Sequence, residues 1–447
     1  MTESSQSKQN HYKLFDLSSF SSSKQHQEHL VALDQKKLPT NTTTQYHTIH
    51  RWFNFIAGFS PEFVKKCCGQ ANLNENSKVL DPFAGCGTTL VEVCKHGLKC
   101  FGYEPNPFFY RISQGKLPFK NSLESLVEIE SIILTGFQNP QNLSILPNAP
   151  YKFLNKLFDE QVLSLLLGAR EFLLKSELKN HQLPFLILSK VLDLCSHSQT
   201  DGIYKAPTSK KQPKSPEYAL KSVLEILQRD LLLFQNQDFN ELATVFQNSS
   251  ENMSEIEDNT ISLIVTSPPY LNNFDYAEMT RMYLYFWGIA NSWSEITSQV
   301  RSKLVINTTT ALKGHKSKQD FYRNQIPAKL YSELDSIVSQ LQEQRKIRAG
   351  KKDYNFLVYP YFYQITQILK ECHRVMKNYA YINIVIADSA LYGIHISTPQ
   401  YIELILETIG FKEIRCKFLR KRGHRWLLDK RDGSKIGLGE YHIEAIK

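Results

Sequence analysis

The chain of 447 residues is long enough for one large or two ordinary domains, and its hydrophobic content of 42% supplies a sizeable core. Its formal charge of +9 favours a polyanionic partner, since clustered Lys and Arg raise the affinity for phosphate groups. Eight cysteines without CxxC spacing argue against a disulfide framework or a zinc site, and no apolar run approaches membrane-spanning length, so we expect a cytoplasmic protein with no metal and no membrane partner.

Polar residues dominate the first part of the chain, and an α/β pattern follows. Residues 1–43 are rich in Ser, Gln, Lys and Thr and predict a disordered tail. Residues 46–68 show helical spacing of apolar side chains, broken at Ser60-Pro61. Strand-like segments come next at 78–81 and 99–104, with a glycine loop and a helix between them. This order predicts the start of a βαβ unit with a parallel sheet.

Two segments interrupt the α/β pattern. Residues 121–245 are leucine-rich with helical spacing and include a stretch of Pro, Lys and Ser at 205–216, which predicts a helical insertion carrying a basic loop. A second, polar insertion is expected at about 300–353.

The remaining strands are expected in the second half of the chain. An apolar run at 261–266 resumes the sheet, and 379–387 is the best later strand. Segments 411–419 and 441–446 predict a final antiparallel pair.

The loop from Asp81 to Thr89 reads DPFAGCGTT and joins the first strand to a helix. Its glycines let the backbone pass close to a ligand, and the helix N-terminus, with Thr88 or Thr89 as cap, favours a carboxylate or another anion. Glu104 ends the second strand, where a Rossmann-type acid bonds ribose hydroxyls. Without Gly-Lys-Ser/Thr or GxGxxG, the loop argues against nucleoside triphosphates and nicotinamide and favours another nucleoside-bearing cofactor.

Ser267-Pro268-Pro269-Tyr270 follows the strand at 261–266. Neither proline has an N–H group and each fixes its own φ, so we expect backbone carbonyls to point at a pocket beside the Tyr270 ring. That arrangement suits a planar ring bearing an amine. Asn272, Asn273, Asp275 and Tyr276 either hydrogen-bond such a ring or serve as turn residues.

Together, the loop at 81–89 and the segment 266–270 resemble the S-adenosylmethionine-dependent DNA amino-methyltransferases. The resemblance covers about 46–118 and 258–447, and residues 48–61 are similar to the helix that lines the cofactor pocket in that family. It implies S-adenosyl-L-methionine as cofactor and catalysis by Ser267, Pro268, Pro269 and Tyr270. The cofactor-binding residues that it implies are Asp81, Phe83, Ala84, Gly85, Gly87, Thr88 and Glu104.

The resemblance also implies an α/β, Rossmann-like methyltransferase fold, with a mostly parallel twisted sheet, a terminal antiparallel strand and a helical insertion. We divide the chain into a polar tail (1–43), a first catalytic part (44–120), a helical insertion (121–250) and a second catalytic part (251–447). The insertion at 121–250 is the candidate target-recognition region, and the basic insertion at 300–353 is its rival. The DPFxGxGTT spelling is commonest in relatives where Pro-Pro-Tyr comes first, whereas here it comes second.

The expected substrate is an exocyclic amine of a flipped base in double-stranded DNA. Methylation at cytosine C5 needs a Pro-Cys nucleophile, and no proline of this chain precedes a cysteine. In the resembled family Ser-Pro-Pro-Tyr mostly accompanies cytosine N4, so we predict a cytosine-N4-specific enzyme of a restriction-modification system, associated with the nucleoid when bound to DNA. A restriction endonuclease sharing the target is a candidate partner. The alternatives are adenine N6, an RNA or tRNA amine, and non-catalytic DNA binding.

Basic clusters are candidates for phosphate contacts, although each also suits a solvated face. The residues assigned to DNA binding are Arg345, Lys346, Lys421, Arg422 and Arg425.

Overall fold

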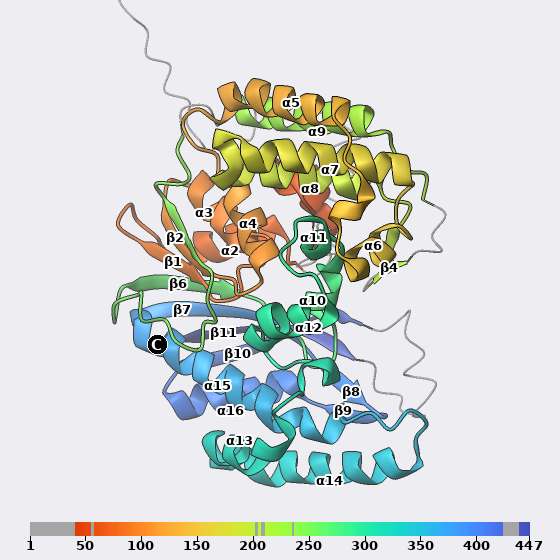
Figure 1. Cartoon of the computed structure of the whole chain (residues 1–447). Coiled ribbons are helices and arrows are strands. Elements are labelled where there is room, and N and C mark those ends of the chain that lie inside the picture. The colour runs from red at the N-terminus through yellow and green to blue at the C-terminus, as the bar shows by residue number, and fades with distance from the viewer. Residues whose placement is uncertain (1–40, 55–57, 202–203, 207–210, 235–236, 423–437) are drawn as a thin grey trace, which may run out of the picture. The chain divides into compact units, whose positions relative to one another are not determined.

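A seven-stranded sheet forms the centre of the fold in the order β10-β11-β7-β6-β1-β2-β5 (Figure 1). The computed structural model describes residues 41–54, 58–201, 204–206, 211–234, 237–422 and 438–447. Most of the predicted tail at 1–43 and Arg425 lie outside these residues. The strands are β1 (Lys78–Asp81), β2 (Lys99–Tyr103), β5 (Ala243–Phe246), β6 (Ile261–Thr266), β7 (Met376–Ala387), β10 (Lys412–Lys421) and β11 (Gly439–Ile446).

The pairing of these strands confirms the predicted fold class. From β5 to β7 neighbouring strands run parallel, whereas β11 is antiparallel to both β7 and β10. The sheet is therefore mostly parallel, and the expected final antiparallel pair is confirmed as β10 and β11. Counted in chain order within the sheet, the strands lie 3-2-1-4-5-7-6, so the order reverses between β1 and β6. Ligands bind at such a reversal in open α/β sheets.

Alternating side chains divide the apolar core between the two faces of the sheet. Val79 and Leu263 belong to one buried cluster, whereas Leu80 and Ile264, which follow them on the paired strands, belong to the other. This alternation follows from the two-residue repeat of a strand. Both faces are consequently covered by helices, as expected of a parallel sheet.

One face carries three helices, of which two begin with a capping side chain; the predicted cap of the third by Thr88 or Thr89 is wrong, because Gly87 occupies the cap position and Thr88 already lies in the helix. The Ser60 hydroxyl accepts a hydrogen bond from the Phe63 amide, and the Asn106 side chain accepts one from the Phe108 amide, each just before a proline at the first helical position. These helices are α2 (Pro61–Gln70), α3 (Thr88–Lys95) and α4 (Pro107–Gly115). Residues 46–60, where helical spacing predicted a helix, instead contain the short 3₁₀ turn η2 (His50–Trp52) after η1 (Asn41–Tyr46).

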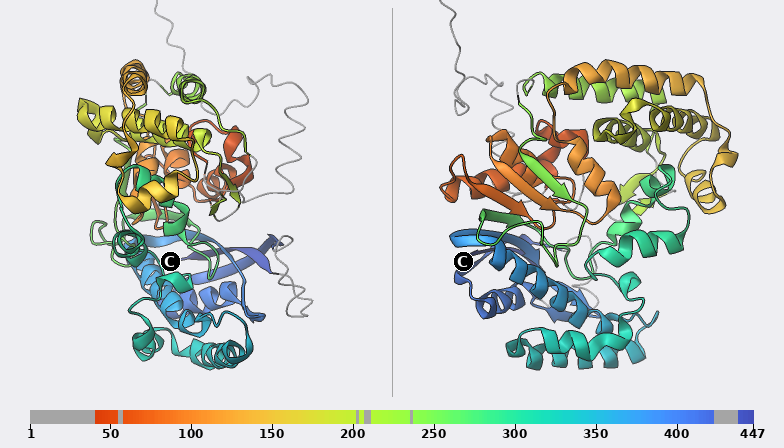
Figure 2. Two further views of the ribbon diagram at one scale, coloured as in Figure 1. Left: turned by 45° about the vertical axis from the view of Figure 1, so that its right-hand side comes forward. Right: turned by 60° about the vertical axis from the view of Figure 1, so that its left-hand side comes forward.

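The segment after α4 is helical, as predicted. Its four longer helices pack on one another and on α4 through α8, forming a layer beyond α3 and α4 (Figures 1 and 2), and the short α6 packs on the later segment Arg281–Phe286. The helices of the segment after α4 are α5 (Ser122–Gln138), α6 (Asn148–Leu154), α7 (Glu160–Lys175), α8 (Gln182–Cys195) and α9 (Pro216–Leu231).

Two strand features of this segment were not predicted. The sheet resumes at β5, so the boundary at residue 250 is too late, because a four-residue strand gives little periodic signal. A short antiparallel hairpin, β3 (Gln199–Asp201) and β4 (Tyr204–Ala206), also lies within the segment.

The later helices of the second half cover the opposite face, whereas the three helices that directly follow β6 pack on the side of α4 and α8. β6 is followed by α10 (Tyr276–Met279), α11 (Arg281–Phe286) and α12 (Trp293–Glu295). Then come α13 (Gln319–Gln325), α14 (Tyr331–Ile347), α15 (Val358–Val375) and α16 (Thr398–Ile409), and a small hairpin of β8 (Ser389–Leu391) and β9 (Ile394–Ile396). In Figure 1, α13 and α14 lie beyond α15 and α16, on the side of the sheet away from α5–α9. None of the described helices is long and apolar enough to cross a membrane.

Candidate active site

The two sequence motifs meet where the strand order reverses. β1 and β6 are parallel neighbours, so the loop after Asp81 and the turn after Thr266 leave the sheet at the same edge. The Asp81 carboxylate joins them: it accepts hydrogen bonds from Thr266 Oγ1 and Thr89 Oγ1, both at 2.7 Å, and from the Phe83 amide at 3.0 Å. Burial raises the pKa of Asp81 to about 6, against these hydrogen bonds, which lower it.

A cavity that opens to solvent lies at this edge, with about 980 Å³ of free space including its mouth. Its walls come from the ends of β1, β2, β5 and β6, from α4, from the segment before α2 and from the segment after α12. The predicted site residues that line it are Phe83, Ala84, Gly85, Thr88, Glu104, Ser267 and Pro269. Asp81, Gly87, Pro268 and Tyr270 are not among the lining residues. Asp81, assigned to cofactor binding from the sequence, therefore positions the two loops.

The two glycines of the loop, Gly85 and Gly87, have different structural roles. Gly85 has φ of +51° and Gly87 of +80°, a region that favours glycine. A Cβ on Gly85 would meet open space, with the Phe83 carbonyl oxygen at 3.9 Å, whereas a Cβ on Gly87 would lie 3.1 Å from Ser113 Cβ. Gly85 thus opens the backbone to the cavity, and Gly87 allows α4 to pack closely.

Glu104 is a buried acid in the cavity wall. Its carboxylate accepts hydrogen bonds from the amide of Gly85 at 3.0 Å and from that of Asn106 at 2.7 Å. Burial raises its pKa to about 8, although both amides favour the charged form. Each carboxylate oxygen retains a lone pair for a further donor, so the residue is suited to bind a pair of hydroxyl groups.

The Ser-Pro-Pro-Tyr turn is anchored by bonds to its backbone and side chains. Ser267 Oγ donates to the Val385 carbonyl at 3.0 Å. Tyr361 Oη donates to the Pro269 carbonyl at 2.9 Å, and Asn307 Nδ2 to the Tyr270 carbonyl at 3.2 Å. These contacts fix the turn from β7, from α15 and from the segment after α12.

Arg422, which the sequence predicted to bind DNA, lies over the Tyr270 ring. The Tyr270 hydroxyl donates to Glu440 at 3.0 Å, and the Arg422 guanidinium lies 4.9 Å from the centre of the ring. Arg420 Nε bonds the other Glu440 oxygen at 2.6 Å. Burial and the Glu440 charge raise the pKa of Tyr270 well above its usual value, so the phenol stays protonated. The basic end of β10 is thereby brought onto the Ser-Pro-Pro-Tyr motif.

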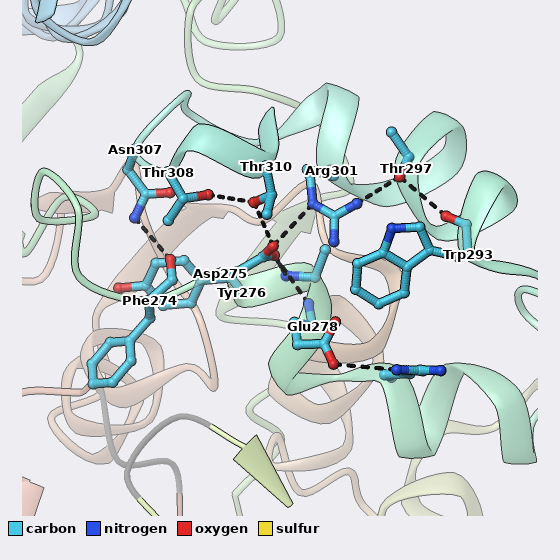
Figure 3. A network of polar contacts seen from close by, with 12 residues as sticks. Phe274, Asp275, Tyr276, Glu278, Trp293, Thr297, Arg301, Asn307, Thr308 and Thr310 are labelled. Atoms are coloured by element: carbon cyan, nitrogen blue, oxygen red, sulfur yellow. Dashed lines mark hydrogen bonds and ion pairs between the residues drawn. The ribbon is translucent and has the colours of Figure 1, made fainter. Parts of the chain in front are cut away.

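The loop after Tyr270 is held by the start of the predicted basic insertion (Figure 3). Asp275 accepts hydrogen bonds from the amides of Ala277 and Glu278, from Arg301 Nε at 3.1 Å and from Thr310 Oγ1 at 2.7 Å. Asp275 is thus a helix cap and a loop anchor, in agreement with its alternative reading as a turn residue. Tyr276, by contrast, lines the cavity.

Among the described residues, the other candidates for DNA binding are exposed or paired with acids. Lys421 is exposed near the end of β10. On α14, Arg345 pairs with Asp353 at 2.9 Å and Lys346 with Glu343 at 2.7 Å. Charges neutralised in this way are weaker candidates for phosphate binding than Arg422.

Several cavity residues were not found from the sequence. Ser249 and Ser250 follow β5 as Glu104 follows β2, so recognition of that strand would have indicated them. Lys303, on the segment after α12, and Lys116, at the end of α4, gave no pattern that distinguishes them from surface lysines. In the described part of the chain, no group of three or more His, Cys, Asp or Glu is placed to hold a metal ion.

Comparisons with known proteins agree with this geometry. The family described as DNA methylase matches residues 2–115, which include the glycine loop and Glu104. Type II methyltransferase M.BsoBI from Geobacillus stearothermophilus is 25% identical over 439 residues, covering 87% of this chain and 83% of the relative. Type II methyltransferase M.AvaI from Nostoc sp. is 24% identical over 401 residues, covering 81% and 79%. Type II methyltransferase M.MvaI from Kocuria varians is 23% identical, covering 83% and 85%.

The sheet order and the cavity at its reversal define a Rossmann-like methyltransferase. With the match of residues 2–115 to the DNA methylase family and the similarity to Type II methyltransferases, the comparisons support the S-adenosylmethionine-dependent DNA amino-methyltransferases as the family that this chain resembles. Enzymes of this family take their methyl group from S-adenosylmethionine. The residues present fit that cofactor, because Glu104 is free to bind ribose hydroxyls and the open space at Gly85 admits a ligand close to the backbone.

Proposed function

We propose that the protein methylates the exocyclic N4 amine of cytosine in duplex DNA, as the modification enzyme of a restriction-modification system. The observation that carries the choice of cytosine is Ser267 at the cavity edge, with its hydroxyl bonded to the Val385 carbonyl. This position offers a neutral hydroxyl rather than a carboxylate or an amide, and Ser-Pro-Pro-Tyr mostly accompanies cytosine N4 in the family. The relatives named Type II methyltransferases support the role in modification.

The turn residues perform the chemistry by holding the amine. The lone pair of the cytosine amine is delocalised into the ring, so the amine is a weak nucleophile. The carbonyls of Ser267 and Pro268 accept hydrogen bonds from its N–H groups. These bonds concentrate the lone pair on the nitrogen and direct it at the methyl group of the cofactor. Bound S-adenosylmethionine supplies an electrophilic methyl group on its sulfonium. After attack the nitrogen loses a proton to solvent, so no strong base is required.

Tyr270 supplies the stacking surface for a base flipped out of the duplex. Arg422 lies over that ring in the free protein, so the incoming base either replaces the guanidinium or stacks on the opposite side. In both cases Arg422 remains beside the site, where it binds a phosphate of the flipped nucleotide. The tie between the Tyr270 hydroxyl and Glu440 keeps the ring in place during this exchange.

Target reading is assigned to the helical insertion, α5–α9, which lies between the two motifs in sequence. The basic segment at 300–353 is the weaker candidate, because its first residues are engaged with Asp275 and Tyr270. A restriction endonuclease that cuts the same sequence is the expected partner in the cytoplasm.

The experiment is methylation of duplex DNA with labelled S-adenosylmethionine, followed by digestion to nucleosides. Labelled N4-methylcytosine is expected, and methylome sequencing of cells that express the protein then gives the target sequence. If labelled N6-methyladenine is found instead, the substrate is adenine and not cytosine. Label that is removed by RNase would move the substrate to RNA, and cofactor binding without any transfer would indicate a DNA-binding protein.

A further inference from the structure

Lys116 is a buried lysine in the wall of the cofactor cavity. It follows α4 directly, its side chain is among the largest of the fully buried ones, and the residue is 1% exposed. It lines the cavity together with Cys86 and Phe109. Lysine is almost never fully buried without a partner, so its surroundings require an explanation.

No counter-ion accompanies Lys116 among the residues that the structure describes. No carboxylate there lies within ion-pair distance, and its pKa is lowered to about 8, mainly by burial. The neighbouring lysines differ in this respect: Lys95 pairs with Glu92 at 2.7 Å, and Lys190 lies 3.8 Å from Asp193. Burial raises the pKa of the Cys86 thiol to about 12, so at neutral pH this neighbour carries no negative charge. The ammonium group of Lys116 is therefore a cation without compensation.

A buried cation without a counter-ion at a ligand cavity favours the binding of an anion, because a negative group on the ligand then serves as the counter-ion. The acid of the cavity wall, Glu104, does not supply this charge, since it binds two backbone amides and no lysine. S-adenosylmethionine has hydroxyl groups on its ribose and a carboxylate at the end of its methionine part. The α3 N-terminus, where Thr88 lines the same cavity, adds a favourable dipole for that carboxylate.

We propose that Lys116 binds the α-carboxylate of the cofactor's methionine part, while Glu104 binds the ribose. The inference rests on the assigned use of S-adenosylmethionine and adds the residue that recognises its amino-acid end. It makes the enzyme selective for cofactors and products that retain the carboxylate.

The test compares three ligands by titration calorimetry on the full chain. They are S-adenosylhomocysteine, its decarboxylated analogue 5′-S-(3-aminopropyl)-5′-thioadenosine, and 5′-methylthioadenosine, which lacks the whole amino-acid part. The wild type is expected to bind S-adenosylhomocysteine at least about 30-fold more tightly than the decarboxylated analogue, the loss typical of removing one partner of a buried ion pair. In Lys116→Met this preference is expected to fall to about threefold or less, with binding of 5′-methylthioadenosine unchanged.

Lys303→Met is the matched control, since Lys303 lines the same cavity but is exposed. This variant is expected to keep the wild-type preference. The proposal is overturned if Lys116→Met retains the preference, or if it weakens all three ligands equally, which would indicate a structural role. Should Lys116→Met not fold, the wild type decides: equal affinity for the two amino-acid ligands refutes the proposal. If the wild-type protein binds none of the three ligands, the assignment of S-adenosylmethionine as its cofactor is itself refuted.

Discussion

The ion pair of Arg301 and Asp275 gives a direct test of how the loop after the Ser-Pro-Pro-Tyr turn is held in place. Both side chains are buried, with 3% and 7% of their surface exposed, and Arg301 Nε lies 3.1 Å from Asp275 Oδ2. Arg301→Met keeps much of the apolar length of the side chain but leaves the Asp275 charge without its cation. Breaking a buried ion pair by removing one partner costs about 3–5 kcal/mol of folding free energy.

The lower end of that range applies here, because Asp275 keeps its bonds to Thr310 and to the amides of Ala277 and Glu278. We therefore expect Arg301→Met to lose about 3 kcal/mol, measured from urea unfolding. Because Asp275 anchors the loop directly after Tyr270, turnover should also fall at least about tenfold, the size of effect that a small misplacement of reacting groups produces. Affinity for S-adenosylhomocysteine should remain within about twofold of the wild type, since Arg301 does not line the cavity.

Arg281→Met is the control for this measurement. The Arg281 and Arg301 guanidinium groups both lie beside the Trp293 ring, at 5.0 and 4.7 Å from its centre. Arg281, however, pairs with Glu278 at 3.4 Å in a partly exposed position, where such pairs contribute about 1 kcal/mol or less. Equal unfolding midpoints for the Arg301 variant and the wild type would refute the importance of the buried pair. A parallel loss of ligand affinity and turnover would refute its specific action on the catalytic loop.

Three further predictions concern residues of the motifs. Tyr270→Ala should lower turnover by about tenfold to a hundredfold, the contribution of one base–aromatic stack, whereas Tyr270→Phe keeps the ring and should lose far less; equal losses would contradict the stacking role. Gly85→Val should abolish binding of S-adenosylhomocysteine in calorimetry, because φ of +51° disfavours a branched residue and its side chain would enter the cavity. The pKa of Glu104 is raised from 4.5 to about 8 by burial, so between these pH values the unfolded chain loses the proton while the folded protein retains it, and the folded state loses stability as the pH rises. Glu104→Gln should thus gain melting temperature relative to the wild type from pH 5 to pH 8 without ligand, and a constant difference would contradict this.

The sequence was sufficient for those parts of the site that local chemistry determines. Apolar runs ending in Pro or Gly identified β1 and β6, and the parallel order of the strands then brought Ser267 and Gly85 to one cavity. The direction of a side chain at a strand end is not contained in such a motif. Asp81 was accordingly assigned to the cofactor, although its carboxylate is engaged by Thr89 and Thr266 inside the protein.

Residues that join the site from a distance were beyond prediction for a different reason. Lys116 ends an amphipathic helix, where lysine is ordinarily exposed, and it is the packing of α8 on α4 that covers this region. Arg301 similarly appeared as one cation in a basic segment, and its carboxylate partner stands 26 positions earlier in the chain. In both cases the tertiary contact gives the residue its role, and no local pattern records it.

The helical insertion is tied to the segment before α2 by one buried carboxylate. Asp230, buried on α9, accepts hydrogen bonds from the Ile49 amide at 2.8 Å, from Trp52 Nε1 at 2.9 Å and from Arg51 Nε at 3.1 Å. These residues belong to the segment that continues to Phe59 in the cavity wall. Since a buried carboxylate with these donors is costly to displace, a shift of α9 is transmitted to η2 rather than absorbed between them. The helical insertion therefore holds η2 in place, and η2 packs against η1, whose Thr44 lines the cavity.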